Sequence, residues 1–248
     1  IGPLLSWNYT SQSVLLNRFK LPLSISFLSG LGYIIFSSLF QLYVFVAIMG
    51  VSFTLSSILG EFYKSFKKQK NSSNFLHSIV KMFLSNRHKN GGYIVHIGIV
   101  LLFIGFIGRA FEVEKEFSLS PGEQIYFSNY VFKLNSIKSE ARDNHYAFLS
   151  EIDVVDSSTN QLLTNLKPEK RIYFYWNSDP EKRQPHSELD IYSTIQKDIY
   201  SIFSGYDAQK NIGYFKIMIN PLVNWVWIGG VLMVIGSLFA FWPSRRNS

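Results

Sequence analysis

The stretch GGYIVHIGIVLLFIGFIG, residues Gly91 to Gly108, decides the fold class because it is apolar apart from one residue, His96. A helix rises about 1.5 Å per residue, so about 20 apolar residues cross the hydrocarbon core of a bilayer. Together with the two residues that follow, the stretch predicts a membrane-spanning helix over Gly91–Ala110. His96 then lies about 7.5 Å along this helix from Gly91, inside the span but near one end.

Three further membrane spans are predicted, two before this stretch and one after it. Leu21–Phe62 carries no charged residue except Glu61 near its end. Its length predicts a hairpin of two short helices, Pro22–Phe36 and Gln41–Leu59, that turns near Ser37 and Ser38; a single long tilted helix is the alternative. The remaining span follows near the C-terminus.

That last span is predicted over Pro221–Trp242. Trp225, Trp227 and Trp242 lie near its ends, where tryptophan side chains anchor helices at the membrane surface. Between the hairpin and the histidine-bearing span, Phe75–Leu84 has apolar residues at helical spacing. This pattern predicts an amphipathic helix that lies on the membrane or on neighbouring helices.

About 110 residues of mixed polarity separate the last two spans, and short apolar runs alternate there with turn signals. The strand-like runs are Gln124–Leu134, Phe148–Val155, Arg171–Trp176 and Ile199–Phe203, with turns at Pro121-Gly122 and Ser178-Asp179-Pro180. The fold class predicted is a membrane protein of about four transmembrane α-helices with a β-rich extracytoplasmic domain inserted before the last helix.

The distribution of charge predicts the topology. Residues 112–216 hold 16 of the 17 acidic residues but only 12 of the 24 basic ones. The other basic residues, apart from Arg109, flank the spans at Arg18–Lys20, Lys64–Arg87, Lys89 and Arg245-Arg246. Because loops rich in Lys and Arg stay in the cytoplasm, the β-rich domain is predicted on the opposite side. It has no basic stripe with interleaved aromatics, which argues against a nucleic-acid partner, and none is predicted.

The predicted segments follow from the spans and the charges. They are a cytoplasmic segment (1–20), a transmembrane hairpin (21–60), a basic cytoplasmic loop with the amphipathic helix (61–90), the histidine-bearing helix (91–110), the β-rich domain (111–218), the last helix (219–243) and a cytoplasmic tail (244–248). The chain begins at Ile1 without an initiator methionine or a signal peptide, so we expect a fragment or the downstream part of a longer protein.

His96 is the first candidate for a functional residue, because ionisable side chains inside a membrane span are costly and mark functional sites. A neutral histidine that bonds a carbonyl or water is the alternative. Gly91, Gly98 and Gly105 recur every seven residues and allow close approach of another helix or, equally, of a flat cofactor. An imidazole in an apolar slot beside small residues suits axial ligation of a haem iron.

Five motifs of the chain resemble those of a known family. The motifs that carry the resemblance are GPLLSW (Gly2–Trp7), the Gly91–Gly108 stretch, PEKRIY (Pro168–Tyr173), DIY (Asp198–Tyr200) and NPLVNWVWIGGVLMVIGSLFAFWP (Asn220–Pro243). In this order they are similar to the C-terminal part of CcmF, the haem lyase subunit of cytochrome c maturation. The resemblance covers nearly the whole chain.

The resemblance implies that His96 is one of two axial ligands of an intramembrane haem b in the inner membrane of a bacterium or an organellar equivalent. It also implies an extracytoplasmic face where haem, brought by a haem chaperone, is joined to the thiols of a CxxCH motif in apocytochrome c. The chain has no cysteine, so the thiols belong to the substrate and its thiol-handling subunits.

The family's Trp-rich haem-handling segment, its extracytoplasmic histidines and the second haem b ligand belong to an N-terminal portion and have no counterpart here. The chain alone is therefore not a complete enzyme. We expect its partner to be the N-terminal part of the same protein or a split subunit. A non-enzymatic membrane scaffold, whose β-rich domain recruits partner subunits while His96 is only packed, is the alternative function.

The PEKRIY motif is the second candidate site. Arg171, with Glu169 and Glu188, is predicted to contact haem propionates, apocytochrome or a partner subunit through its planar guanidinium group. A turn with solvated Lys170 and Arg171 is the alternative. His77, His88, His145 and His186 are expected in surface segments or loops, and no set of three or four convergent metal ligands can be assembled from the sequence.

Overall fold

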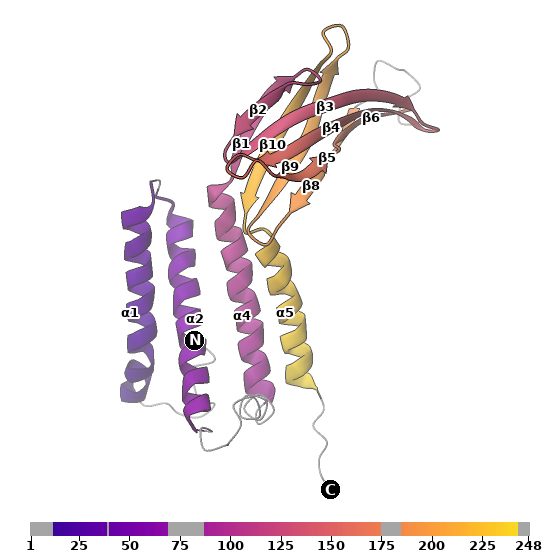
Figure 1. Ribbon diagram of the computed structural model, residues 1–248. Coiled ribbons are helices and arrows are strands. Elements are labelled where there is room, and N and C mark those ends of the chain that lie inside the picture. The colour runs from indigo at the N-terminus through magenta and orange to yellow at the C-terminus, as the bar shows by residue number, and fades with distance from the viewer. Residues whose placement is uncertain (1–11, 39, 69–86, 175–184, 243–248) are drawn as a thin grey trace. The chain divides into compact units, whose positions relative to one another are not determined.

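The computed structural model describes residues 12–38, 40–68, 87–174 and 185–242 (Figure 1). The chain divides into two compact units, a helical unit that comprises the residues up to Ala110 and from Leu222 onward, and a β-rich unit over Phe111–Pro221. The β-rich unit is thus inserted before the last helix. This confirms the predicted combination of membrane-type helices and a β-rich domain.

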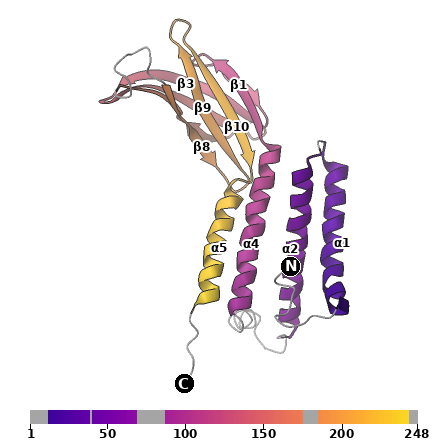
Figure 2. The same ribbon diagram turned by 180° about the vertical axis from the view of Figure 1, so that it is seen from behind.

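Four helices of the described residues are long and apolar enough to cross a membrane. They are α1 (Gln12–Phe36), α2 (Leu42–Lys68), α4 (Arg87–Gly108) and α5 (Asn224–Phe241), and a short 3-10 turn, η2 (Arg109–Phe111), follows α4. Helix α1 packs on α2, α2 packs on α4, and α4 packs on α5, as Figures 1 and 2 show from opposite sides. The chain turns between α1 and α2 at the predicted place.

The ends of these helices differ from the sequence prediction. Pro22, predicted to open the first helix, lies inside α1, and α2 continues nine residues beyond Leu59. Helix α4 begins at Arg87, within the segment predicted to be a loop. Lys and Arg are good helix formers, and their long side chains can extend their charges toward water. A helix can therefore continue beyond the end of its apolar segment. The predicted amphipathic helix Phe75–Leu84 lies outside the described residues.

Helices α4 and α5 meet through glycines. A methyl group added at Gly98 would lie 2.6 Å from the carbonyl oxygen of Gly229, and one added at Gly91 would lie 2.6 Å from Cβ of Ala240. At Gly105 the added methyl would collide with Val226. The seven-residue glycine repeat therefore serves helix packing, the first of the two alternatives that the sequence left open.

The β-rich unit consists of two antiparallel sheets (Figure 1). The order is β1-β10-β9-β8 in one and β2-β3-β4-β6-β7 in the other, with β5 beside β4. The strands are β1 (Val113–Leu119), β2 (Gln124–Phe127), β3 (Tyr130–Ala141), β4 (His145–Asp156), β5 (Leu162–Leu166), β6 (Glu169–Tyr173), β7 (Pro185–Glu188), β8 (Asp190–Ser193), β9 (Lys197–Asp207) and β10 (Ile212–Pro221).

The core of this unit is formed by alternate residues of strands in both sheets. Phe132 and Leu134 of β3 are fully buried, as are Phe203 of β9 and Ile217 of β10. The rings of Phe203 and Phe215 stack at a centroid distance of 4.8 Å. All residues of the buried cluster come from this unit, so it has a hydrophobic core of its own.

Several strand predictions need correction. Gln124–Leu134 is two strands rather than one, because Ser128 adopts a left-handed backbone (φ 55°) and the chain reverses there. PEKRIY is not a turn, since Glu169–Tyr173 forms β6. Pro221 ends β10 instead of opening α5, and a strand end tolerates its missing N–H. Gly122 (φ 94°) forms the predicted turn, whereas Ser178-Asp179-Pro180 lies outside the described residues.

Candidate functional site

His96 lies in α4 and is half-buried. Its Nδ1 is 2.7 Å from the carbonyl oxygen of Gly92, one turn earlier in the helix. A carbonyl oxygen only accepts, so Nδ1 carries the proton and donates, and the lone pair of the neutral ring lies on Nε2. This tautomer, fixed by a backbone carbonyl, is the one that metal-ligating histidines commonly use. The alternative of a carbonyl-bonded histidine is compatible with ligation, because the bond occupies only one ring nitrogen.

The glycine repeat and His96 lie on opposite sides of α4. Helical spacing places His96 on the same face as Ile99, Val100 and Phe103, at three, four and seven residues further on. These three residues form one wall of a groove of about 790 Å³ between α4 and α2. The α2 wall is formed by Leu42, Tyr43, Val46, Ala47, Gly50, Val51 and Thr54. His96 is not a lining residue but lies one turn beyond this apolar groove.

In the other direction along the same face, Tyr93 and Lys89 contact Glu61 of α2. The Glu61 carboxylate lies 3.2 Å from Nζ of Lys64 and 3.2 Å from Nζ of Lys89, and it accepts a 3.5 Å hydrogen bond from the Tyr93 hydroxyl. We call Glu61, Lys64, Lys89 and Tyr93 the Glu61 cluster. The sequence prediction missed it as a site, although a lone acid at the end of an apolar stretch was the signal that pointed to it.

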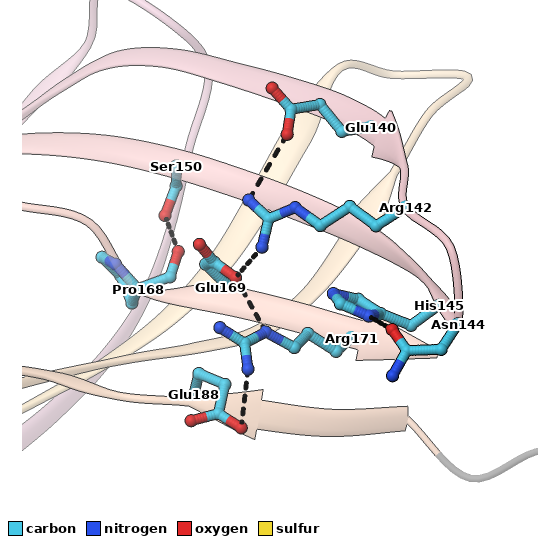
Figure 3. A network of polar contacts seen from close by, with 9 residues as sticks. All are labelled: Glu140, Arg142, Asn144, His145, Ser150, Pro168, Glu169, Arg171 and Glu188. Carbon is cyan, nitrogen blue, oxygen red and sulfur yellow. Dashed lines mark hydrogen bonds and ion pairs between the residues drawn. The ribbon is translucent and has the colours of Figure 1, made fainter. Parts of the chain in front are cut away.

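The second predicted site is assembled by the pairing of β6 with β7, which sets Glu169 opposite Glu188. Nε of Arg171 lies 2.8 Å from Glu169, and its Nη1 lies 3.3 Å from Glu188 (Figure 3). Arg142 extends the network, at 3.4 Å from Glu169 and 3.3 Å from Glu140. The structure therefore brings the three predicted residues together.

We call Glu140, Arg142, Glu169, Arg171 and Glu188 the Arg171 network. Its carboxylates and guanidinium groups are paired with one another. A hydrogen bond with the Tyr173 side chain, followed by the contacts with Glu169 and Glu188, raises the pKa of the Arg171 guanidinium above its ordinary value. Three carboxylates against two guanidinium groups leave a net negative charge. Such a surface favours a basic protein partner over a carboxylate such as a haem propionate.

Of the remaining histidines, the three that the structure describes belong to no group of metal ligands. His77 lies outside the described residues, and His88 is exposed at the start of α4, with its ring 6.5 Å from that of Phe241. His145 and His186 lie on β4 and β7, not in loops, and their rings both contact Tyr173. Among the described residues, no three His, Cys, Asp or Glu side chains converge. A metal held here needs ligands from elsewhere or, as in haem, from the cofactor itself.

Comparisons with known proteins match both units. The family described as the CcmF C-terminal beta-sandwich matches residues 110–221, which is the β-rich unit. A solved structure of Cytochrome c Heme Lyase CcmF has the same fold over 98% of this chain, with a TM-score of 0.70 and 19% sequence identity. The chain is similar to the C-terminal part of CcmF. The resemblance predicted from the sequence motifs is thereby confirmed.

Curated relatives agree with this assignment. The Cytochrome c-type biogenesis protein CcmF of Haemophilus influenzae is 23% identical over 99% of this chain, which covers 36% of that protein. The Cytochrome c-type biogenesis protein ccl1 of Rhodobacter capsulatus is 28% identical over 61% of this chain and 22% of its own length. The chain spans 37% of the solved CcmF structure. This chain is therefore about a third as long as the Haemophilus influenzae CcmF and the solved CcmF, both of which it matches along nearly all of its own length.

Proposed function

We propose that this chain is the C-terminal portion of a haem lyase for cytochrome c maturation, embedded in the inner membrane. The similarity to CcmF along both units supports this role. The chain supplies one axial ligand of an intramembrane haem b, and its β-rich domain, on the extracytoplasmic side, takes part in attaching haem to apocytochrome c. The chain covers 36% of the Haemophilus influenzae CcmF, and the remaining part of the enzyme is supplied by an N-terminal part of the same protein or by a split subunit.

The residue that carries this proposal is His96. The Gly92 carbonyl holds Nδ1 protonated, so Nε2 would be the atom that binds an iron, and a second ligand would come from the rest of the enzyme. The groove lined by Ile99, Val100 and Phe103 supplies apolar surface on the same helix face. An apolar shell suits a haem that stays in the membrane, and a haem b held in this way supplies one-electron transfer.

The reaction at the extracytoplasmic face needs no cysteine in the enzyme. Each thiol of the CxxCH motif adds across a vinyl double bond of haem, its sulfur to one carbon and its hydrogen to the other. This addition consumes no electron, so the task of the lyase is to position the reactants. A separate requirement is that the thiols and the iron are kept reduced until they react. The absence of cysteine from this chain fits a division in which the substrate brings both thiols.

The experiment that tests this function is His96→Ala in the complex that contains the N-terminal portion. We expect the absorbance of one b-type haem to disappear, because alanine offers no ligand. The matched control is His88→Ala, since His88 lies on the same helix but is exposed at its start, and we expect the spectrum to remain. A complete haem b spectrum in His96→Ala contradicts the ligand assignment and favours the scaffold function.

A further inference from the structure

Glu61 is the only acidic residue of the chain outside residues 112–216, and its side chain is only 11% exposed. It lies in the part of α2 that can span a membrane. A buried charge is tolerated when it is paired and hydrogen-bonded, and the Glu61 cluster supplies both conditions. One partner, Lys64, comes from the same helix, whereas Lys89 and Tyr93 come from α4.

The contacts of Glu61 tie α2 to the histidine-bearing face of α4. On the opposite face, α4 is fixed to α5 by close glycine contacts that leave no room for a side chain. On the His96 face, the apolar groove separates α4 from α2 between Leu42 and Thr54. At the other end of this face, the Phe62 and Tyr93 rings meet edge to face at 5.2 Å beside Glu61. The Glu61 cluster is therefore a polar attachment between α2 and α4 that lies beyond the end of the groove nearest His96.

We propose that Glu61 is a positioning residue for the haem ligand His96. It holds α2 against the His96 face of α4, and its negative charge offsets one of the two positive charges of Lys64 and Lys89. This inference rests on the proposed function, because it assumes that His96 ligates haem. Tyr93 links the two residues, since it contacts Glu61 and precedes His96 by three positions, which is about 4.5 Å along the helix.

Replacement of Glu61 has two separable consequences. In Glu61→Gln the two lysines, whose side chains are already 59% and 44% exposed, lose their counter-charge and turn toward water. The contact between α2 and α4 then loosens. In addition, the net charge beside His96 becomes more positive, which stabilises ferrous over ferric haem and raises the midpoint potential. Glu61→Asp keeps the charge and is the conservative comparison.

The first measurement is the distance between α2 and α4, which can be determined whether or not haem is bound. The chain has no cysteine, so Leu59→Cys on α2 and Phe106→Cys on α4 place one spin label on each helix at exposed positions outside the groove. We expect electron-electron distance measurements on the full complex to give a broader distribution in Glu61→Gln than with native Glu61, and Glu61→Asp to stay close to native. Equal distributions in all three variants overturn the inference.

The second measurement is the midpoint potential and the haem retention of the complex in detergent. We expect a higher potential and lower retention in Glu61→Gln. The double variant Glu61→Gln with Lys89→Gln has no unpaired charge between the helices, so we expect it to reverse most of the rise in potential. The control for haem retention is Lys64→Gln, because Lys64 is 59% exposed and bonds Glu61 within α2, so its loss leaves the tie between the helices intact.

Failure of this inference and failure of the proposed function are distinguishable. If His96→Ala removes the haem b spectrum but Glu61→Gln keeps the native potential and retention, the haem function stands and Glu61 is not a positioning residue. If His96→Ala leaves the spectrum unchanged, the ligand assignment falls, and the positioning role falls with it. A merely structural role of Glu61 would lower stability without the rescue of potential in the double variant.

Discussion

At the scale of the residue, the polar side chains that interrupt apolar helices carry the functional argument. The sequence already marked His96 as a candidate, whereas Glu61 emerged as a site in the structure, where its contacts join α2 to α4. Each is partnered: His96 by the Gly92 carbonyl and Glu61 by two lysines and Tyr93. Unpaired polar groups are costly in apolar surroundings. These partners lower the free-energy cost of placing the two side chains there.

Arg171 allows a prediction at the same scale. Arg171→Met leaves Glu169 with only the longer contact to Arg142. Hydrogen bonds to charged groups contribute about 1.5–3 kcal/mol, and part of this is lost to solvent here, so we expect β6 and β7 to open about 1–2 kcal/mol more easily. Hydrogen exchange of the amides in these strands, in the full chain, measures this opening.

The control for Arg171 is Lys210→Gln. Lys210 is 69% exposed and lies 3.8 Å from Asp207, so its ion pair is screened and contributes less than about 1 kcal/mol. We expect protection in the hairpin between β9 and β10 to stay within error of native. Equal effects of the two substitutions would show that the Arg171 network does not stabilise the sheet more than a surface pair does.

At the scale of the element, the pair α4 and α5 is the most closely packed part of the helical unit. Membrane helices gain little from apolar contact, because lipid offers the same contact, so small residues that let backbones approach are decisive. Gly229 and Gly236 of α5 face Gly98 and Gly91 of α4. This packing turns the His96 face away from α5 and toward α2.

Two adjacent glycines of α5 provide a matched test of this packing. A methyl group at Gly229 would lie 2.5 Å from the carbonyl oxygen of Gly98 and 2.9 Å from the amide nitrogen of Leu102, whereas one at Gly230 meets nothing within 4 Å. Overpacking against backbone costs about 1–3 kcal/mol, so we expect Gly229→Ala to lower the unfolding temperature of the helical unit in detergent. Gly230→Ala should be neutral or slightly stabilising, since alanine favours helices. Similar melting of the two variants would contradict the assigned packing.

At the scale of the whole molecule, the chain consists of two units with separate sources of stability. The helical unit depends on close helix contacts and a few polar pairs, whereas the β-rich unit buries aromatic and aliphatic side chains between two sheets. A substitution in one unit therefore acts mainly within that unit. This separation agrees with the proposed function, in which the helical unit holds haem b and the β-rich unit takes part in haem attachment.

The separation predicts that residues 111–221 fold when excised, because every residue of their buried cluster lies within this range. We expect a β-type circular dichroism spectrum and one cooperative thermal transition in aqueous buffer. Phe203→Ala, which removes a fully buried ring, should lower stability by about 3–5 kcal/mol or prevent folding. A non-cooperative melt of the native excised unit would show that its core depends on the helices.

The sequence by itself determined the elements that depend on local composition. The four apolar spans, the inserted β-rich region, the glycine repeat and His96 follow from periodicity and from the cost of polar groups in apolar surroundings. Family motifs then identified the CcmF resemblance. Element ends were less predictable, as Pro22 inside α1 and Pro221 at the end of β10 show, because helices and strands extend wherever neighbours satisfy their backbone groups.

Only the tertiary structure decided which residues meet. The glycine repeat and His96 share one helix, and only the packing of α5 showed that the repeat serves a helix contact. Glu61 and Tyr93 lie 32 positions apart, and Glu169 meets Glu188 only through the register of β6 with β7. Contacts between residues distant in the sequence depend on helix rotation and strand register, which no local pattern encodes, and this is why the Glu61 cluster was found in the structure alone.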